Sequence, residues 1–236
     1  MQITKWPKYF PPLTPEQEAI RDDFMRYWHE VLPRKFGFVD RFNHGYVATH
    51  AGEFRRTLEI GAGLGEHLAY EKLTPGQRQN YVANDLRANM LEQLQTRNPA
   101  VQIILGDCQT EFDFPNGYFD RIIAIHVLEH LPNLPAAVRE MHRLLDKQRG
   151  FLQIVIPCEG GLAYSLARRI SAQRIFEKRY RQPYRWFIER EHVNVPREIL
   201  GELNQYFDVQ ATRYWPLPIP SVALNLCIAL RCVPKA

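Results

Sequence analysis

Three glycines at alternate positions, Gly61, Gly63 and Gly65, follow a short apolar run that contains Glu59. Glycine permits left-handed backbone and the close approach of a ligand, so the pattern predicts a buried strand turning sharply into a helix at a nucleotide-type site. The dinucleotide fingerprint requires glycine where this chain has Glu66, and the Gly-Lys-Ser/Thr triplet of a P-loop is absent. The pattern therefore disfavours a phosphate ligand. The alternative is a glycine-rich turn that binds nothing.

Acids also stand at the ends of the next two predicted strands. A helix is predicted over residues 65–72, followed by a turn at residues 74–76. Residues 80–85 then read as a strand ending in Asp85, where a carboxylate can accept hydrogen bonds from two ribose hydroxyls. Asp85 can equally cap the helix predicted over residues 86–97, or serve both purposes. The strand predicted over residues 101–105 leads into Asp107, which is either part of the same site or a turn former.

This ordered set resembles the first motifs of class I S-adenosylmethionine-dependent methyltransferases. Residues 114–131 look like the strand-four region of the small-molecule group that includes quinone-biosynthesis enzymes. The resemblance implies S-adenosylmethionine as cofactor and S-adenosylhomocysteine as product. This cofactor carries a sulfonium and an ammonium and no phosphate, so acids suit its site. The residues that the resemblance assigns to the cofactor are Glu59, Gly61, Ala62, Gly63, Gly65, Asp85, Leu86, Asp107, Cys108 and His126.

The resemblance covers roughly residues 55–156 and implies an α/β fold. We expect a Rossmann-like, doubly wound seven-stranded sheet with a reversed C-terminal hairpin. Residues 150–156 supply its fifth strand, and residues 206–214 and 222–232 can supply the last two. One domain is expected, comprising an N-terminal helical cover over residues 1–54, a cofactor-binding core over 55–158, an insertion over 159–196, and a C-terminal helix and hairpin over 197–236.

The two segments outside the core are expected to select the acceptor. A helix is predicted over residues 15–31 from the helical spacing of Ile20, Phe24, Tyr27 and Val31, followed by an aromatic, glycine-punctuated segment over residues 36–46. Eight basic residues and two acids lie between residues 168 and 190, so the local charge of +6 exceeds the +4 of the whole chain. Interleaved aromatics make this insertion a candidate cap over a partly anionic acceptor. A solvated helix face with its aromatics in the core is the alternative.

Histidines are the candidate catalytic residues. His192 is the first choice for a general base, because it lies at the end of the insertion, where the chain should return toward the carboxyl edge of the sheet, and imidazole accepts a proton near neutral pH. His126 and His130 are the alternatives. Methyl transfer can also proceed without a strong base, because the sulfonium is intrinsically reactive and alignment supplies much of the rate. His126, Glu129 and His130 form only a weak local ligand set without the order of zinc proteases, so no metal is expected.

Composition indicates a globular protein large enough for a substantial core, with 236 residues, 45% hydrophobic and 24% charged. The N-terminus lacks a signal peptide, and no apolar run approaches the length of a membrane span, so we expect a cytoplasmic enzyme. Reduced thiols fit that compartment. The four cysteines, of which Cys158 reads as a buried thiol or loop residue, form no close metal-binding pair.

The sequence predicts methyl transfer from S-adenosylmethionine to oxygen or nitrogen of a small-molecule acceptor, and the basic insertion suits a partly anionic one. The Asn/Asp-Pro-Pro-Tyr/Phe motif that accompanies methylation of adenine or glutamine amino groups is absent. The first alternative is an RNA or nucleotide-linked substrate held by the basic insertion. The second is a non-catalytic module that binds the cofactor for regulation. The sequence identifies neither the acceptor nor the oligomeric state.

Overall fold

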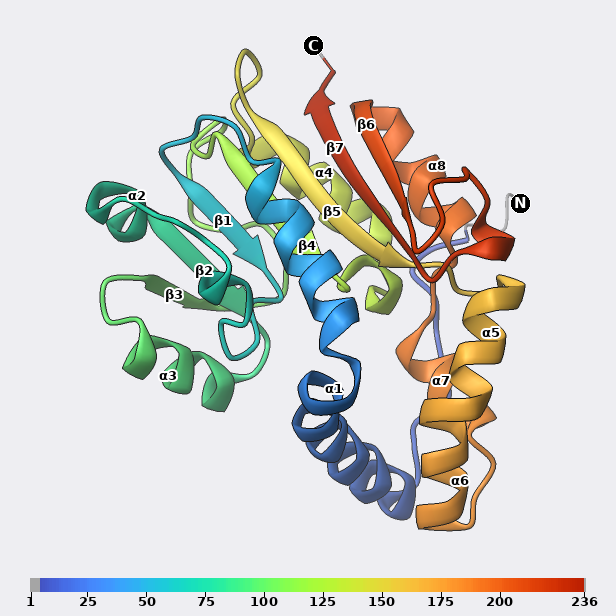
Figure 1. Ribbon diagram of the computed structural model, residues 1–236. Coiled ribbons are helices and arrows are strands. Elements are labelled where there is room, and N and C mark those ends of the chain that lie inside the picture. Colours follow the sequence, from blue (N-terminus) through green and yellow to red (C-terminus); the bar gives the residue numbers. More distant parts are fainter. Residues whose placement is uncertain (1–4, 236) are drawn as a thin grey trace.

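A seven-stranded sheet forms the centre of the molecule, with strand order β3-β2-β1-β4-β5-β7-β6 (Figure 1). The computed structural model describes residues 5–235, and for residues 28–36 it describes the backbone alone. Strands β1 to β5 are parallel, whereas β7 runs antiparallel to both β5 and β6. The predicted doubly wound sheet with a reversed C-terminal hairpin is therefore confirmed. The strands are β1 Thr57–Ile60, β2 Tyr81–Asp85, β3 Gln102–Leu105, β4 Arg121–Ile125, β5 Phe151–Pro157, β6 Phe207–Trp215 and β7 Cys227–Pro234.

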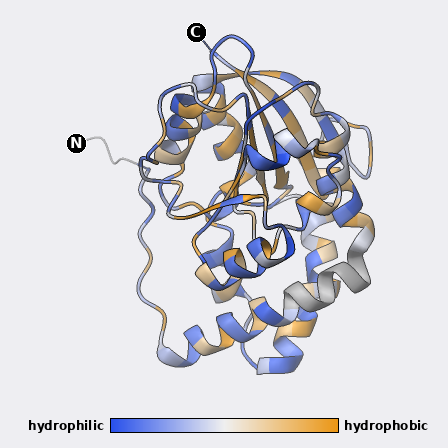
Figure 2. Cartoon of the chain, turned by 90° about the vertical axis from the view of Figure 1, so that its left-hand side faces the viewer, coloured by the Kyte–Doolittle hydropathy of each residue, from blue (hydrophilic) through white to orange (hydrophobic). Residues whose placement is uncertain are grey.

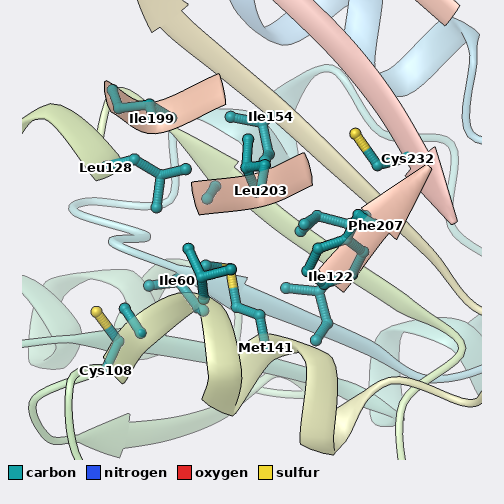
Figure 3. Packing of buried hydrophobic residues seen from close by; sticks show 14 of the residues in the cluster. Ile60, Cys108, Ile122, Leu128, Met141, Ile154, Ile199, Leu203, Phe207 and Cys232 are labelled. Carbon is teal, nitrogen blue, oxygen red and sulfur yellow. The ribbon is translucent and has the colours of Figure 1, made fainter. Parts of the chain in front are cut away.

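Helices cover both faces of this sheet. The helical elements are α1 Pro15–Thr49, η1 His67–Ala69, α2 Pro75–Gln79, α3 Ala88–Arg97, η2 Leu128–His130, α4 Leu134–Leu144, α5 Leu162–Arg168, the π-helical turn η3 Arg169–Gln173, α6 Arg174–Tyr180, α7 Arg185–Glu191, α8 Pro196–Tyr206 and η4 Val222–Leu224. Successive side chains of a strand point to opposite faces, so a strand buried on both faces is apolar throughout. Ile122 packs with Met141 of α4 and Leu203 of α8 (Figure 3). Ile123 packs with Val47 of α1 on the other face.

The N-terminal helix is longer than the sequence predicts. It runs over Pro15–Thr49 and includes the aromatic, glycine-punctuated segment over residues 36–46, beyond the end of the predicted helix. Phe42 and Tyr46 pack on the sheet face, and Phe42 stacks on Trp215, so tertiary packing outweighs the low helix propensity of two glycines. The predicted packing of Val31 lies outside the described side chains.

Two local predictions are wrong. The helix expected over residues 65–72 is the three-residue turn η1, because Gly65 adopts φ of +82° and delays the start of regular helix. The turn expected at residues 74–76 begins helix α2, where Thr74 and Gln77 form a capping box. The chain thus leaves the glycine loop through a compact turn rather than a long helix.

The insertion after β5 folds as helices α5 to α7, which pack on the N-terminal half of α1 (Figure 1). Phe24 of α1 meets Phe176 and Phe187 edge to face, with ring centroids 5.1 Å apart in each pair. Tyr184 joins the same buried cluster. Figure 2 shows hydrophobic and hydrophilic residues mixed along these helices, as expected of elements that bury one face. Among the described residues, no helix combines the length and apolar character needed to cross a bilayer.

Candidate functional site

The carboxyl ends of β1 and β4 mark the point where the strand order reverses direction, which is where open parallel sheets bind ligands. The loops after β1, β2, β3 and β4 all leave the sheet at this edge. They carry the predicted glycines, Asp85, Asp107 and His126. The fold therefore brings the predicted cofactor residues to one edge of the sheet.

The glycine loop after β1 needs its glycines for two separate reasons. Gly61, Gly63 and Gly65 adopt φ of +70°, +55° and +82°, a region that side chains disfavour. A Cβ atom on Gly61 would lie 2.4 Å from Cγ2 of Val127, and one on Gly65 would lie 3.0 Å from Cγ of Leu94. Close packing against protein neighbours therefore accounts for Gly61 and Gly65. The close approach of a ligand is therefore not the only reason why these two positions require glycine.

Asp85 ties the glycine loop to the end of β2. Its Oδ2 accepts a hydrogen bond from the Gly63 amide at 3.0 Å, and its Oδ1 accepts one from the Arg87 amide at 2.9 Å. Arg87 is the cap residue of α3, so Asp85 fixes the start of that helix without being its cap. A carboxylate offers about four lone-pair sites, which leaves acceptor capacity for ribose hydroxyls. The neighbouring Leu86 is 64% exposed and presents an apolar surface at the same edge.

The loop after β3 is held from within by Asp107. Its Oδ1 accepts hydrogen bonds at 2.9 Å from both the backbone amide and the side-chain amide of Gln109. Gln109 in turn accepts from the Asn133 amide at 2.6 Å, which links the loop to the start of α4. Cys108 is buried, and burial raises the pKa of its thiol to about 12. Asp107 thus has the contacts of a turn former, while its position at the sheet edge agrees with a cofactor contact.

Glu59 lies deeper than the other predicted cofactor residues. It is buried in β1, and the Tyr81 hydroxyl donates a hydrogen bond to its Oε2 at 2.7 Å. Burial raises the pKa of this carboxyl, and the charge of His67 and the Tyr81 hydrogen bond oppose that rise. A direct contact of Glu59 with the cofactor stays a prediction.

A further acid that the sequence reasoning missed comes from helix α1. Asp40 is half-buried, and its pKa is raised by burial and by the negative charge of Glu66, while His126 opposes the rise. Asp40 therefore shares an electrostatic environment with the glycine loop and with the residue after β4. An acid near the loop suits a cationic ligand and repels phosphate. The helical spacing of the N-terminal segment contained no signal for this role.

His126 turns the chain sharply after β4. It adopts φ of +53°, which is uncommon for a residue other than glycine and often accompanies a functional site. Its Nδ1 lies 3.1 Å from Oε1 of Glu129. Burial lowers the pKa of His126, but hydrogen bonds to Cys227 and Glu129 outweigh burial and raise it to about 10.

His192 and His130 meet beside Glu129, although His192 is distant in the sequence. The His130 and His192 rings are arranged edge to face with centroids 5.1 Å apart. Nδ1 of His192 lies 2.8 Å from Oε2 of Glu159, a carboxylate just after β5 that the sequence reasoning did not select. Burial lowers the pKa of His130 to about 4. The three candidate catalytic histidines are therefore neighbours around one buried glutamate.

Asn194, which was not selected from the sequence, fixes the position of this histidine cluster. Its fully buried amide donates hydrogen bonds to the carbonyl oxygens of Leu128 at 2.8 Å and Leu131 at 2.7 Å. Its backbone amide donates to the Glu129 carbonyl at 3.0 Å. The C-terminal end of the insertion is thereby joined to η2. Asn in the run 191–196 gave no signal by itself, because its partners are 63 to 66 residues away.

The basic residues of the insertion are partly neutralised. Arg168 pairs with Glu159, Arg179 lies 2.9 Å from Asp23, and Arg185 lies 2.6 Å from Glu189. The buried aromatics form the cluster around Phe24, which agrees with the core interpretation of those residues. A groove of about 490 Å³ borders His192, lined by Lys8, Phe10, Pro11, Trp186, Glu189, Arg190, His192 and Val193.

The donor set at the sheet edge fits S-adenosylmethionine. Asp85 offers a carboxylate for ribose hydroxyls, Leu86 offers an exposed apolar surface for a flat ring, and Asp40 and Glu66 supply negative charge for a cation. The glycine loop contains no lysine or arginine that would select a phosphate. The negative charge of Asp40 and Glu66 would disfavour the pyrophosphate of a dinucleotide.

Comparison with known proteins agrees with this interpretation. Residues 58–153 match the family model described as a methyltransferase domain. A search of curated proteins finds no match. Among solved structures, the PH0226 protein from Pyrococcus horikoshii OT3 superposes with a TM-score of 0.62 at 14% identity, covering 89% of this chain and 99% of that chain.

Two further solved structures carry the demethylated cofactor product in their descriptions. The N-methyltransferase NodS from Bradyrhizobium japonicum WM9, in complex with S-adenosylhomocysteine, has a TM-score of 0.58 at 16% identity and covers 86% of this chain and 89% of that chain. The 1,6-didemethyltoxoflavin-N1-methyltransferase from Burkholderia thailandensis, with bound 1,6-didemethyltoxoflavin and S-adenosylhomocysteine, has a TM-score of 0.58 at 17% identity and covers 98% of this chain and 94% of that chain. Residues 58–153 therefore form a methyltransferase domain, and the chain as a whole has the fold of these methyltransferase structures.

Proposed function

We propose that the protein transfers the methyl group of S-adenosylmethionine to an oxygen or nitrogen atom of a small-molecule acceptor. The proposal rests on the close arrangement of His126, His130 and His192, which lie at the edge of the sheet that carries the predicted cofactor residues. The cofactor supplies a methyl group activated by a positive sulfonium. The acceptor atom forms a bond to that methyl carbon while the electron pair of the C–S bond stays on sulfur.

In the metal-free protein, His192 is the side chain proposed to receive a proton from the acceptor. Glu159 engages Nδ1 of His192, which leaves Nε2 as the free ring nitrogen. A carboxylate behind an imidazole fixes the tautomer and stabilises the imidazolium that forms. His126 and His130 are proposed to line the acceptor site, and the cover formed by α1 and the insertion is proposed to close it.

The groove beside His192 supports a small, partly anionic acceptor. Its lining includes Lys8 and Arg190, together with the aromatic rings of Phe10 and Trp186. The Arg190 guanidinium lies over the Phe10 ring at 5.2 Å, which holds the charge at the groove. NodS and the toxoflavin enzyme are N-methyltransferases by their descriptions, which supports nitrogen as one acceptor atom.

A panel of acceptors tests the proposal by release of S-adenosylhomocysteine. The panel contains phosphorylated sugars, lipid precursors, quinone precursors and short RNA, each assayed at low and high salt. The proposal predicts turnover of a free metabolite with weak salt dependence. Turnover of RNA alone, falling steeply with salt, would instead support the nucleic-acid alternative. Cofactor binding without turnover of any acceptor class would favour a regulatory module.

A further inference from the structure

We propose that Glu129, His130 and His192 form a binding site for one divalent transition-metal ion. Each of the three residues offers one potential ligand atom, and these atoms all lie within 4.8 Å of one another. Metal–ligand distances of about 2.0–2.2 Å place donor atoms roughly 3–4 Å apart around a tetrahedral ion. The described positions are therefore close to a bound arrangement and need only small side-chain adjustments.

The buried carboxylate of Glu129 gives a second, independent indication that a cation binds here. Its side chain is 1% exposed, and Oε1 is engaged by His126 at 3.1 Å. Oε2 is buried and has no hydrogen-bond partner among the described residues. A buried carboxylate oxygen without a partner is costly, whereas a cation would satisfy it. The orphaned oxygen belongs to the same residue that the two imidazoles approach.

A second carboxylate lies beside each imidazole, and the one beside His192 is within hydrogen-bond distance, as is usual for metal-binding histidines. Glu159 lies 2.8 Å from Nδ1 of His192, so Nε2 remains for a ligand. Glu191 lies 3.8 Å from Nδ1 of His130, and Nε2 of His130 lies 3.9 Å from Oε1 of Glu129. Outer carboxylates fix the ring orientation and raise the basicity of the nitrogen that binds the metal.

The ligand set identifies the class of ion. Two imidazoles and one carboxylate suit zinc and related transition metals, whereas magnesium and calcium prefer all-oxygen sites. Three protein ligands leave a coordination position open, as in catalytic rather than structural sites. The expectation that no metal binds rested on residues 126–130 alone. The fold adds His192, which Asn194 fastens to η2 from a distant part of the chain.

The site changes the role assigned to His192, and this step rests on the proposed function. A metal ion on Nε2 would prevent that nitrogen from accepting a proton. The ion would instead bind the acceptor oxygen or nitrogen through its open position and lower the pKa of that group. The metal content of the active protein therefore decides between the two roles.

Metal binding is measured on the full chain after treatment with a chelator and without cofactor or acceptor. Zn²⁺ is titrated in competition with a chromogenic chelator, and Co²⁺ is followed by its visible absorption. We expect one equivalent of either ion in the unaltered protein, and loss of that equivalent in Glu129→Gln and His192→Ala. His50→Ala removes an exposed imidazole at the end of α1 and should keep the equivalent.

Circular dichroism establishes that each variant is folded. Glu159→Gln keeps the shape of the side chain behind His192 and should weaken Zn²⁺ binding by about 10–100-fold. It replaces any variant that fails to fold. Absence of an equivalent in the unaltered protein, its retention in a folded His192→Ala, or an unchanged Zn²⁺ affinity in Glu159→Gln would overturn the proposal. Because the assay contains no cofactor or acceptor, its result is independent of the acceptor screen.

Discussion

Nδ1 of His192 lies 2.8 Å from Oε2 of Glu159, and this contact joins the C-terminal end of the insertion to the loop after β5. The pair places an oriented imidazole beside His130 and Glu129, at the edge of the sheet that is predicted to bind the cofactor. Burial raises the pKa of Glu159, but the hydrogen bonds from His192 and Arg168 outweigh burial and hold it below its usual value. An anionic Glu159 therefore supports His192 whether the ring accepts a proton or binds a metal.

Replacing Asp85 should weaken cofactor binding. Asp85→Asn keeps the size of the side chain but removes the charge that strengthens its hydrogen bonds, each typically contributing about 1.5–3 kcal/mol. We expect the Kd for S-adenosylhomocysteine to rise at least about tenfold in isothermal calorimetry. Asp113→Asn, which alters an exposed acid, is the control. Equal affinity in the two variants would remove Asp85 from the site.

Gly61→Ala should destabilise the fold. The left-handed backbone costs a residue with Cβ roughly 1–2 kcal/mol, and the new atom would also meet Val127 at 2.4 Å. Urea unfolding should therefore show a loss of unfolding free energy that is larger than the backbone strain alone. Gly37→Ala, in the helix α1 where nothing lies within 4 Å of the added atom, should stabilise by about 0.5–1 kcal/mol. An unchanged midpoint for Gly61→Ala would contradict the packing described here.

Acid should destabilise the protein through Glu71. Burial raises the pKa of Glu71, but the hydrogen bond from His67 and the charge and hydrogen bond of Arg121 outweigh burial and lower it to about 2. This lowered pKa stabilises the fold above the unfolded pKa of about 4.3, and the contribution is lost as the pH falls toward 2. Glu71→Gln should therefore be less stable at pH 7 and show a shallower loss of stability between pH 4.5 and 2.

The control for the acid experiment is Glu92→Gln, on the exposed face of α3. It should keep both the stability at pH 7 and the slope of the unaltered protein. Chemical unfolding at a series of pH values measures both quantities. A slope in Glu71→Gln equal to that of the unaltered protein would show that other carboxylates cause the acid transition.

Removing the Asn194 amide should loosen the imidazole cluster. Asn194→Ala deprives two buried carbonyl oxygens of their donor, which costs about 1–3 kcal/mol. We expect lower unfolding stability together with reduced methyl transfer, because His192 is no longer fixed beside Glu129. Asn204→Ala on the surface of α8 should change neither property. If Asn194→Ala is less stable but keeps full turnover at a temperature where it is folded, the hydrogen bonds of the Asn194 side chain are not required for catalysis.

The parts of the fold predictable from sequence are those with local periodicity or local chemistry. The strand ending in Asp85 and the positive φ at Gly61 follow from residues within a few positions of each other. The continuation of α1 past Gly37 was not predictable, because it depends on Phe42 stacking on the distant Trp215. Long-range packing outweighed local propensity there.

The site divides in the same way. The glycines and Asp85 are recognisable by spacing, whereas Glu159 and Asn194 act through partners more than thirty residues away. Single glutamates and asparagines are common on protein surfaces, so neither residue stands out in the sequence. Their functions emerge only when the insertion returns to the carboxyl edge of the sheet.

We expect the edge of the sheet around Asp85 to bind S-adenosylmethionine and not a dinucleotide. Isothermal calorimetry of the full chain with S-adenosylmethionine, S-adenosylhomocysteine and NADH tests this directly. One equivalent of each of the two S-adenosyl compounds should bind, and NADH should not bind. Binding of NADH, or the absence of binding of both S-adenosyl compounds, would contradict it.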